Sequence, residues 1–268
     1  MQRLKQVAYL TVIILLLSHI KLKAINNTIN TDTSVSAAIK EQLAKHKNEL
    51  HYPESVARFY KTEGFKMIWL LPDTVRTPAW SAMLLFDCIL QYGLNPADYR
   101  PMELTYSRLH AMQSGKASNI QKAYFDIELT DAVITLINNL HYGKLNPWFP
   151  AATIDAASTS QFRADAALVN ALKQKQPANA ILNVQPHTEA YANLQHHLKL
   201  LTTKFSGNNY AKPENEIHKI VINMERLRWI NTTGRKIRIT CEVKDGVMIN
   251  YKDVYHQDKK LEKRLYER

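Results

Sequence analysis

Cysteine is the strongest nucleophile that this sequence offers, and the chain has two, Cys88 and Cys241. A catalytic cysteine needs a base and positive surroundings that lower the pKa of its thiol, and no histidine lies near either cysteine in the sequence. The apolar stretch WSAMLLFDCILQYGL around Cys88 favours a buried, unreactive thiol. Cys241 lies in a segment typical of a strand. In an oxidising compartment the two could form a disulfide, and the sequence leaves that pairing open.

The histidines are not spaced as metal ligands. His196 and His197 are adjacent, so on a helix they point to different faces, and His141 and His187 have no partner at a ligand spacing. The sequence therefore predicts neither a metal ion nor a cofactor.

Three further polar residues could contact a ligand or hold the fold together. Asp98 and Tyr99 follow the turn over residues 93–96, where such side chains cap a helix and close the turn. Asp131 follows Thr130 inside a long apolar segment, where a polar contact with a neighbouring helix is the alternative to catalysis. We favour the structural role for all three.

A cluster of charged and aromatic residues lies in the segment INMERLRWI, residues 222–230. Arg226, Arg228 and Trp229 could bind a carboxylate or a sugar ring. Glu225 and an arginine three residues away on a helix also interact with each other, and an arginine can stack on a tryptophan. The sequence favours this internal arrangement over ligand binding.

The elements that must position these residues are helices. The chain has only seven glycines and few alternating β-branched stretches, which is typical of a mainly α-helical domain. Pro53 and Pro78 suit first helical turns, and Gly64, Gly93 and Gly143 suit helix ends. The expected helices cover residues 36–50, 53–64, 78–93, 102–113, 118–142, 164–175, 188–204 and 213–229, with a loop over 144–161.

The segment 118–142 has two apolar stripes, which predicts burial on most of its circumference. We expect it at the centre of an irregular helical bundle over residues 34–232, which is long enough to bury a sizeable core. After Gly234 the pattern is that of two strands around Asp245-Gly246, a strong hairpin signal. The expected fold is therefore mainly α, with a short C-terminal β hairpin and a charged tail over residues 233–268.

The first residues carry the pattern of an export signal. Arg3 and Lys5 precede an apolar run over residues 7–17, which is shorter than the ~20 residues of a membrane span. Leu22 fits a cleavage site poorly, so residues 1–24 are either a signal peptide or an uncleaved membrane anchor, with a buried core helix as a third alternative. A polar linker follows over residues 25–33. We expect an exported protein, periplasmic or anchored in the inner membrane facing the periplasm.

The net charge of +11 is concentrated at the two ends of the chain. Residues 1–23 contribute +4, and residues 235–268 hold ten basic against six acidic residues, another +4, which leaves +3 for the middle. A nucleic-acid-binding domain carries a basic face on its folded part, so we expect no nucleic-acid partner. A mildly basic exported protein can instead associate with anionic wall polymer or a membrane surface, and membrane contact is expected only through the N-terminal segment.

Four segments have a recognisable order along the chain: FYKTEGFKMIWL (59–70), GLNPADYR (93–100), ELTDAVITLINNLHYGKLNP (128–147) and INMERLRWI (222–230). Together they resemble the N-terminal scaffold domain of the large murein L,D-transpeptidases, and HTEAYANLQHHLKLL (187–201) adds a fifth, weaker match. The matching positions are Trp69, Gly93, Leu94, Pro96, Tyr99, Leu129, Thr130, Asp131, Gly143, Lys144, Pro147, Asn223, Glu225, Arg226, Arg228 and Trp229.

The resemblance implies a place in peptidoglycan crosslinking, where a cysteine thiolate in a Ser-His-Gly-Cys motif attacks the peptide stem and a histidine acts as base. This chain has no His-Gly pair, and Cys241 lies in Ile-Thr-Cys-Glu. We therefore expect a truncated or split form with no catalysis of its own, in which residues 233–268 begin a catalytic domain. Two alternatives stay open: a non-enzymatic periplasmic adaptor that binds peptidoglycan or a partner protein, and one half of an enzyme whose catalytic domain is encoded separately.

Overall fold

The computed structural model describes residues 35–71, 78–156, 162–204, 213–233, 243–244 and 247–248. The predicted export signal, the linker and Cys241 lie outside these residues. The described part is mainly α-helical, as the sequence predicts. Its elements are a helix over residues 35–45, the 3₁₀ helices η1 (Lys47–Glu49), η2 (Ile89–Tyr92) and η3 (Pro96–Tyr99), the α-helices α2 (Pro53–Thr62), α3 (Pro78–Asp87), α4 (Tyr106–Gln113), α5 (Asn119–Tyr142), α6 (Ala151–Ala156), α7 (Ala164–Leu172), α8 (Pro177–Leu182), α9 (Glu189–Lys204) and α10 (Glu214–Thr233), and the strands β1 (Val243–Lys244) and β2 (Val247–Met248).

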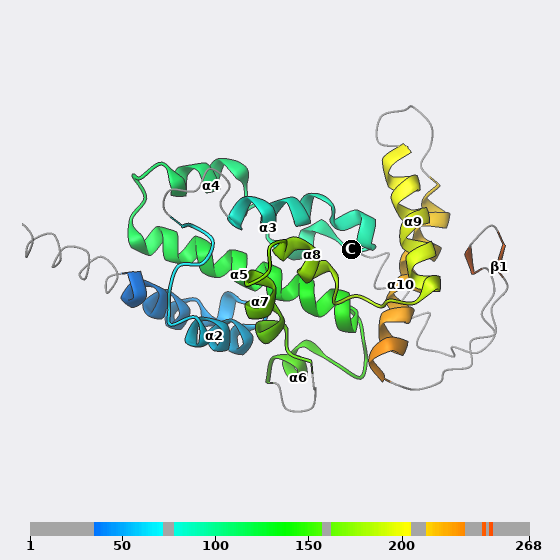
Figure 1. Cartoon of the computed structure of the whole chain (residues 1–268), viewed down its shortest axis with the longest axis horizontal. Helices are drawn as coiled ribbons and strands as arrows, with labels where there is room; N and C mark the ends of the chain where they lie inside the picture. Colours follow the sequence, from blue (N-terminus) through cyan, green and yellow to red (C-terminus); the bar gives the residue numbers. More distant parts are fainter. Residues whose placement is uncertain are drawn as a thin grey trace, which may run out of the picture.

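Helix α5 is the centre of the fold. It runs through the middle of the molecule, with α3 and α4 along one side and α2 along the other (Figure 1). Ser118 caps its N-terminus in a reciprocal capping box with Gln121, and Gly143 follows its last residue. From Phe125 to Leu140 every residue of α5 is buried, which confirms the burial that the two apolar stripes predict.

Several element bounds differ from the sequence-based expectation. Helix α4 begins at Tyr106 rather than at Met102, because the Thr105 side chain accepts a hydrogen bond from the backbone N–H of Arg108 at 3.2 Å. The predicted loop over 144–161 contains α6, which buries Ile154 and Asp155. The Asp155 carboxylate accepts backbone N–H groups at the start of α2, a long-range contact that local patterns do not reveal.

Cys88 is exposed, so the prediction of a buried thiol is wrong. It lies just after α3, a helix that is apolar on nearly all sides and buries Ala79, Ala82 and Met83. Trp80 and Leu84 are on the opposite, exposed side, at the four-residue spacing that Cys88 continues. An apolar stretch without a polar stripe gives no indication of which side faces the core.

Helices α9 and α10 pack against each other across the C-terminal end of α5 (Figure 1). They enclose a second, smaller apolar core formed by Tyr191, Leu194, Leu198, Ile220 and Met224. Helix α10 continues four residues beyond its predicted end at Trp229. None of the described helices is both long enough and apolar enough to span a membrane.

The strands β1 and β2 are antiparallel, with Val243 opposite Met248 and Lys244 opposite Val247. Two residues per strand do not support the longer predicted C-terminal β hairpin, and the rest of that hairpin lies outside the described residues. It stays a prediction.

A buried carboxylate fixes the segment between α2 and α3 against α5. Asp126 is fully buried and accepts the Tyr60 hydroxyl at 2.7 Å and the backbone N–H groups of Ile68 and Trp69 at 3.1 and 2.8 Å. Burial raises the pKa of Asp126 to about 6, although these hydrogen bonds oppose the shift. The ordinary aspartate pKa is near 3.9.

This shift predicts a pH-dependent stability. Between about pH 4 and pH 6 the folded chain binds the Asp126 proton more tightly than the unfolded chain, so this contribution is complete below pH 4 and is lost as the pH rises through 6. We expect the free energy of unfolding of the natural chain, minus that of Asp126→Asn, to fall by about 2–3 kcal/mol across this window. Urea unfolding followed by circular dichroism at several pH values measures it. Exposed Asp87→Asn is the matched control, and a difference for Asp126→Asn that does not change with pH contradicts the assignment.

Candidate functional site

The five matching sequence segments come together at two places on α5. At the first, near its middle, the indole N–H of Trp69 donates to the Thr130 hydroxyl at 2.8 Å, while Leu129 lies in the core. Asp131, also fully buried, accepts the backbone N–H groups of His51 and Tyr52 at 3.1 and 3.0 Å. At this first place, the segments before and after α2 are therefore both hydrogen-bonded to α5.

Arg100 links this region to the turn that precedes it in the sequence. Its guanidinium donates to Asp131 at 3.0 Å and to the backbone carbonyl of Glu49. Asp131 thus has the internal role that the sequence favours, but its partners are the loop before α2 and Arg100 rather than a neighbouring helix. An acid whose oxygens are occupied by three internal donors is not available as a general base.

The second place is the α10 junction, by which we mean residues 93–99, 143–146 and 225–232 together with Tyr191. Helix α5 ends here against α10, and Gly143 makes the close approach possible. It has a φ of +84°, and a Cβ atom at this position would lie 2.7 Å from both Glu225 Oε1 and Trp229 Nε1. Only glycine fits both the backbone angle and the space.

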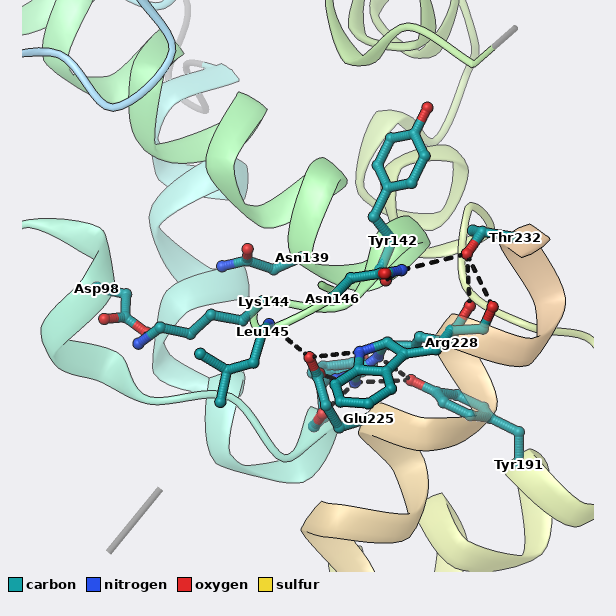
Figure 2. Close-up of polar contacts among 12 residues, drawn as sticks. Asp98, Asn139, Tyr142, Lys144, Leu145, Asn146, Tyr191, Glu225, Arg228 and Thr232 are labelled. Carbon is teal, nitrogen blue, oxygen red and sulfur yellow. Dashed lines mark hydrogen bonds and ion pairs between the residues drawn. The ribbon is translucent and has the colours of Figure 1, made fainter. Parts of the chain in front are cut away.

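The residues after Gly143 each contact a different segment. Lys144 Nζ lies 2.5 Å from the Asp98 carboxylate, and the backbone N–H of Leu145 donates to Glu225 Oε1 at 2.7 Å (Figure 2). The Asn146 side chain donates to the Tyr142 carbonyl at 2.7 Å, whereas Pro147 is exposed. The Gly-Lys-Leu-Asn sequence therefore connects α5, the turn at residues 93–99 and α10.

Arg228 is the most deeply buried charge of the junction, with no exposed surface. Its guanidinium donates to Glu225 Oε2 at 3.2 Å and to the Tyr191 hydroxyl at 2.8 Å (Figure 2). It also donates to the Tyr92 carbonyl at 2.5 Å. Burial alone would lower the pKa of Arg228, but Tyr191 and Glu225 reverse this and hold the pKa above its ordinary value. Because it is enclosed, this guanidinium does not reach an external carboxylate or sugar.

The Glu–Arg interaction is present, but the predicted stacking of an arginine on Trp229 is wrong. Arg228 lies over the Tyr191 ring instead, with Cζ 5.5 Å from the ring centroid. Residues 228 and 229 are consecutive on a helix, so their side chains diverge by roughly 100°, and the facing aromatic ring comes from α9. Trp229 donates its indole N–H to Glu225 Oε1 at 3.1 Å, and Arg226 donates to Asn223 at 3.3 Å.

The turn at residues 93–99 is built around its glycine, proline and tyrosine. Gly93 ends η2 with a φ of +64°, and Pro96 begins η3 after the Asn95 side chain caps it. Tyr99 is buried and accepts a hydrogen bond from Asn139 at 2.9 Å, and Leu94 is buried beside it. Asp98 does not cap a helix; it forms the ion pair with Lys144.

A cavity of about 450 Å³ opens beside α10, between the turn at residues 93–96 and the loop at 144–145. Its walls are mainly aliphatic, with Leu94, Leu145, Val221 and Ile222 among them, and Glu225 lies at one end. Binding cavities in proteins are typically 300–1,000 Å³ and mostly apolar, with a few polar groups. Three of the matching segments therefore line one cavity of an appropriate size.

Sequence reasoning missed several residues of these two places, among them Asp126, Arg100, Asn146 and Tyr191. Asp126 was detectable in principle as a carboxylate within an apolar helix, as Asp131 was. The partners of Arg100 and Tyr191 depend on tertiary contacts across 31 and 37 residues. Within the described residues there is no group of three or more His, Cys, Asp or Glu side chains placed to bind a metal ion.

Comparison with known proteins gives one family. A family model described as Scaffold domain matches residues 54–198, which is more than half of the chain. The match includes the turn at residues 93–99, all of α5, the loop after Gly143 and much of α9. Neither a curated protein nor a solved structure was found to match.

The close approach at Gly143 gives a direct test. We expect Gly143→Ala to destabilise the chain by roughly 1–3 kcal/mol from backbone strain at φ 84°, ψ 145° and by about 1–3 kcal/mol more from the clash with α10. Gly115→Ala is the matched control, because Gly115 has a similar φ of +77° but open space around a Cβ. Urea unfolding of both variants measures the difference, and equal losses would show that the contact with α10 is loose.

The buried ion pair gives a second test. Arg228→Met leaves Glu225 buried without its charged partner, and we expect a loss of about 3–5 kcal/mol. Arg228→Met combined with Glu225→Gln should cost less than the sum of the single changes, because both charges are then removed. Partly exposed Arg226→Met, two residues away, is the control and should change the free energy of unfolding by less than about 1 kcal/mol. Strict additivity of the two changes contradicts the coupling.

Proposed function

Since the chain belongs to the Scaffold domain family, the helical scaffold of L,D-transpeptidases, we propose that it is an exported scaffold in peptidoglycan remodelling. The observation that carries the proposal is the α10 junction. Residues from η2, the α5–α6 loop and α9 all bind the side chains of Glu225 and Arg228, so α10 has a fixed direction relative to the helical body. Holding a partner element in one orientation is what a scaffold contributes to an active site.

The partner in this proposal is a catalytic domain positioned by the end of α10. The chemistry of crosslinking, a cysteine thiolate and a histidine base, would come from that domain, in the same or a separate polypeptide. The hairpin predicted after Gly234 would then add its strands to the sheet of the catalytic domain, because strand edges readily pair with another sheet.

Export supports the same role. The basic residues followed by an apolar run near the N-terminus are those of an export signal, and peptidoglycan is assembled outside the cytoplasmic membrane. The mildly basic charge of the chain also suits contact with an anionic wall polymer.

A second candidate function is an adaptor that binds peptidoglycan or a partner protein without taking part in catalysis. The cavity beside α10 favours it, because a scaffold that only orients a neighbouring domain has no need of a concave apolar site.

The proposal predicts the outcome of a complementation experiment in the native host. With the gene removed, we expect fewer peptide crosslinks of the L,D type in the wall, measured by chromatography of digested muropeptides, and the full chain should restore them. A chain lacking residues 7–17 should remain in the cytoplasm on fractionation and fail to restore them. Exposed Lys116→Met, outside the α10 junction, is the control that should restore them fully. Unchanged crosslinks after gene removal, combined with retention of the chain on purified sacculi, would favour the adaptor and contradict the scaffold proposal.

A further inference from the structure

The scaffold role proposed above does not explain the cavity beside α10. One wall is a continuous stripe of α10, from Ile217 through Val221 to Glu225, in steps of one helical turn. The facing wall is the turn around Leu94 and Pro96. The contacts of the α10 junction fix the positions of these two walls relative to each other.

The two charged side chains of the lining are already neutralised. Lys144 pairs with Asp98 at 2.5 Å, and Glu225 pairs with Arg228 at 3.2 Å while also accepting the N–H groups of Leu145 and Trp229. A charged guest would therefore find neither the ammonium nor the carboxylate of the lining unpaired, and its own charge would lose water without such a partner. A neutral guest meets no such cost.

The remaining lining is aliphatic with a few neutral hydrogen-bonding groups. Leu90 is 53 % exposed and also lines the cavity, so the apolar surface continues from the interior to the opening. Asn95 and Thr202 contribute uncharged polar groups, and the imidazole of His218 also lines the cavity. Burial of hydrocarbon surface is favourable in proportion to its area, and a hydroxyl or amide on the guest could be met at these residues.

We propose that this cavity is a binding site for a neutral, mainly aliphatic molecule that carries at most a hydroxyl or amide group. The guest lies against α10 and against the turn at residues 93–96, in contact with Val221 and Leu145. The proposal is independent of export and of peptidoglycan, so it is tested apart from the scaffold role.

The experiment uses the purified full chain and the neutral, solvatochromic dye Nile red. We expect saturable binding with a blue-shifted emission. Octanol should displace the dye at a concentration at least tenfold lower than octanoate or octylammonium, which have the same chain length and carry a charge. Displacement by either ion as effectively as by octanol overturns the proposal, and so does the absence of saturable dye binding.

Two variants locate the binding. Ile217→Trp places a larger ring into the cavity from a partly exposed position, and it should weaken dye binding at least tenfold. Leu84→Ser is the matched control: it removes an exposed leucine from the apolar side of α3, outside the cavity, and should leave binding unchanged. Circular dichroism confirms that both variants are folded, and Thr202→Phe at another part of the lining replaces Ile217→Trp if that variant is not. Loss of binding in Leu84→Ser with full binding in the cavity variants places the dye on the surface of α3 and overturns the proposal.

Discussion

The complete burial of the Arg228 guanidinium is the constraint from which the arrangement of the C-terminal helices follows. A guanidinium removed from water must have its donors satisfied by the protein, since each unmet donor or unpaired charge is costly. Its partners come from three elements: the Tyr92 carbonyl at the end of η2, the Tyr191 hydroxyl of α9, and Glu225 one turn earlier on α10. The Arg228 guanidinium can therefore be buried only when these three partners are all correctly placed. Replacing such a pair by apolar residues can leave stability unchanged, so the value of the pair lies in admitting a single arrangement.

The same principle holds at the middle of α5, with the charges reversed. Asp126 and Asp131 are buried carboxylates whose acceptors are used by backbone N–H groups of irregular segments, residues 51–52 and 68–69. Such segments have no helical partner for these groups, and a buried N–H needs one. A central helix with acids on two faces can thus fix loops that lack regular structure of their own. The fold is a bundle whose connections are held by side chains of its core helix.

The sequence predicts local features well and tertiary partners poorly. The capping residues Ser118 and Gly143 and the two apolar stripes define α5 correctly, because caps and periodicity are local properties. Helix α6 is missed because it has only six residues, and the contacts of its Asp155 with Glu54 and Ser55 lie about 100 residues away in the sequence. The four matching segments identify a shared family pattern but not which residues contact each other. Only the structure shows that Lys144 pairs with Asp98 and that Leu145 donates to Glu225. The predictions of a buried Cys88 and of an arginine stacked on Trp229 are wrong, because tertiary packing decides which side of α3 faces the core and which ring Arg228 meets.

The persistence of the cavity follows from the polar contacts around it. An apolar cavity between two helical segments normally closes when the segments move together, because contact between its walls is favourable. Here α10 is held at two points one turn apart. Gly93 packs against Val221, where a Cβ would be 3.3 Å from the valine methyl, and Gly143 packs against Glu225 and Trp229. A side chain at either glycine would push α10 away, and the hydrogen bond from Leu145 to Glu225 fixes the distance at the second point. With α10 held by the hydrogen bonds of Glu225 and Arg228, the space beside Ile217 stays open and the walls are available to a guest without rearrangement. A preformed site of this kind avoids the free-energy cost of ordering its walls on binding. The contacts that orient α10 therefore also keep this site ready to bind a ligand.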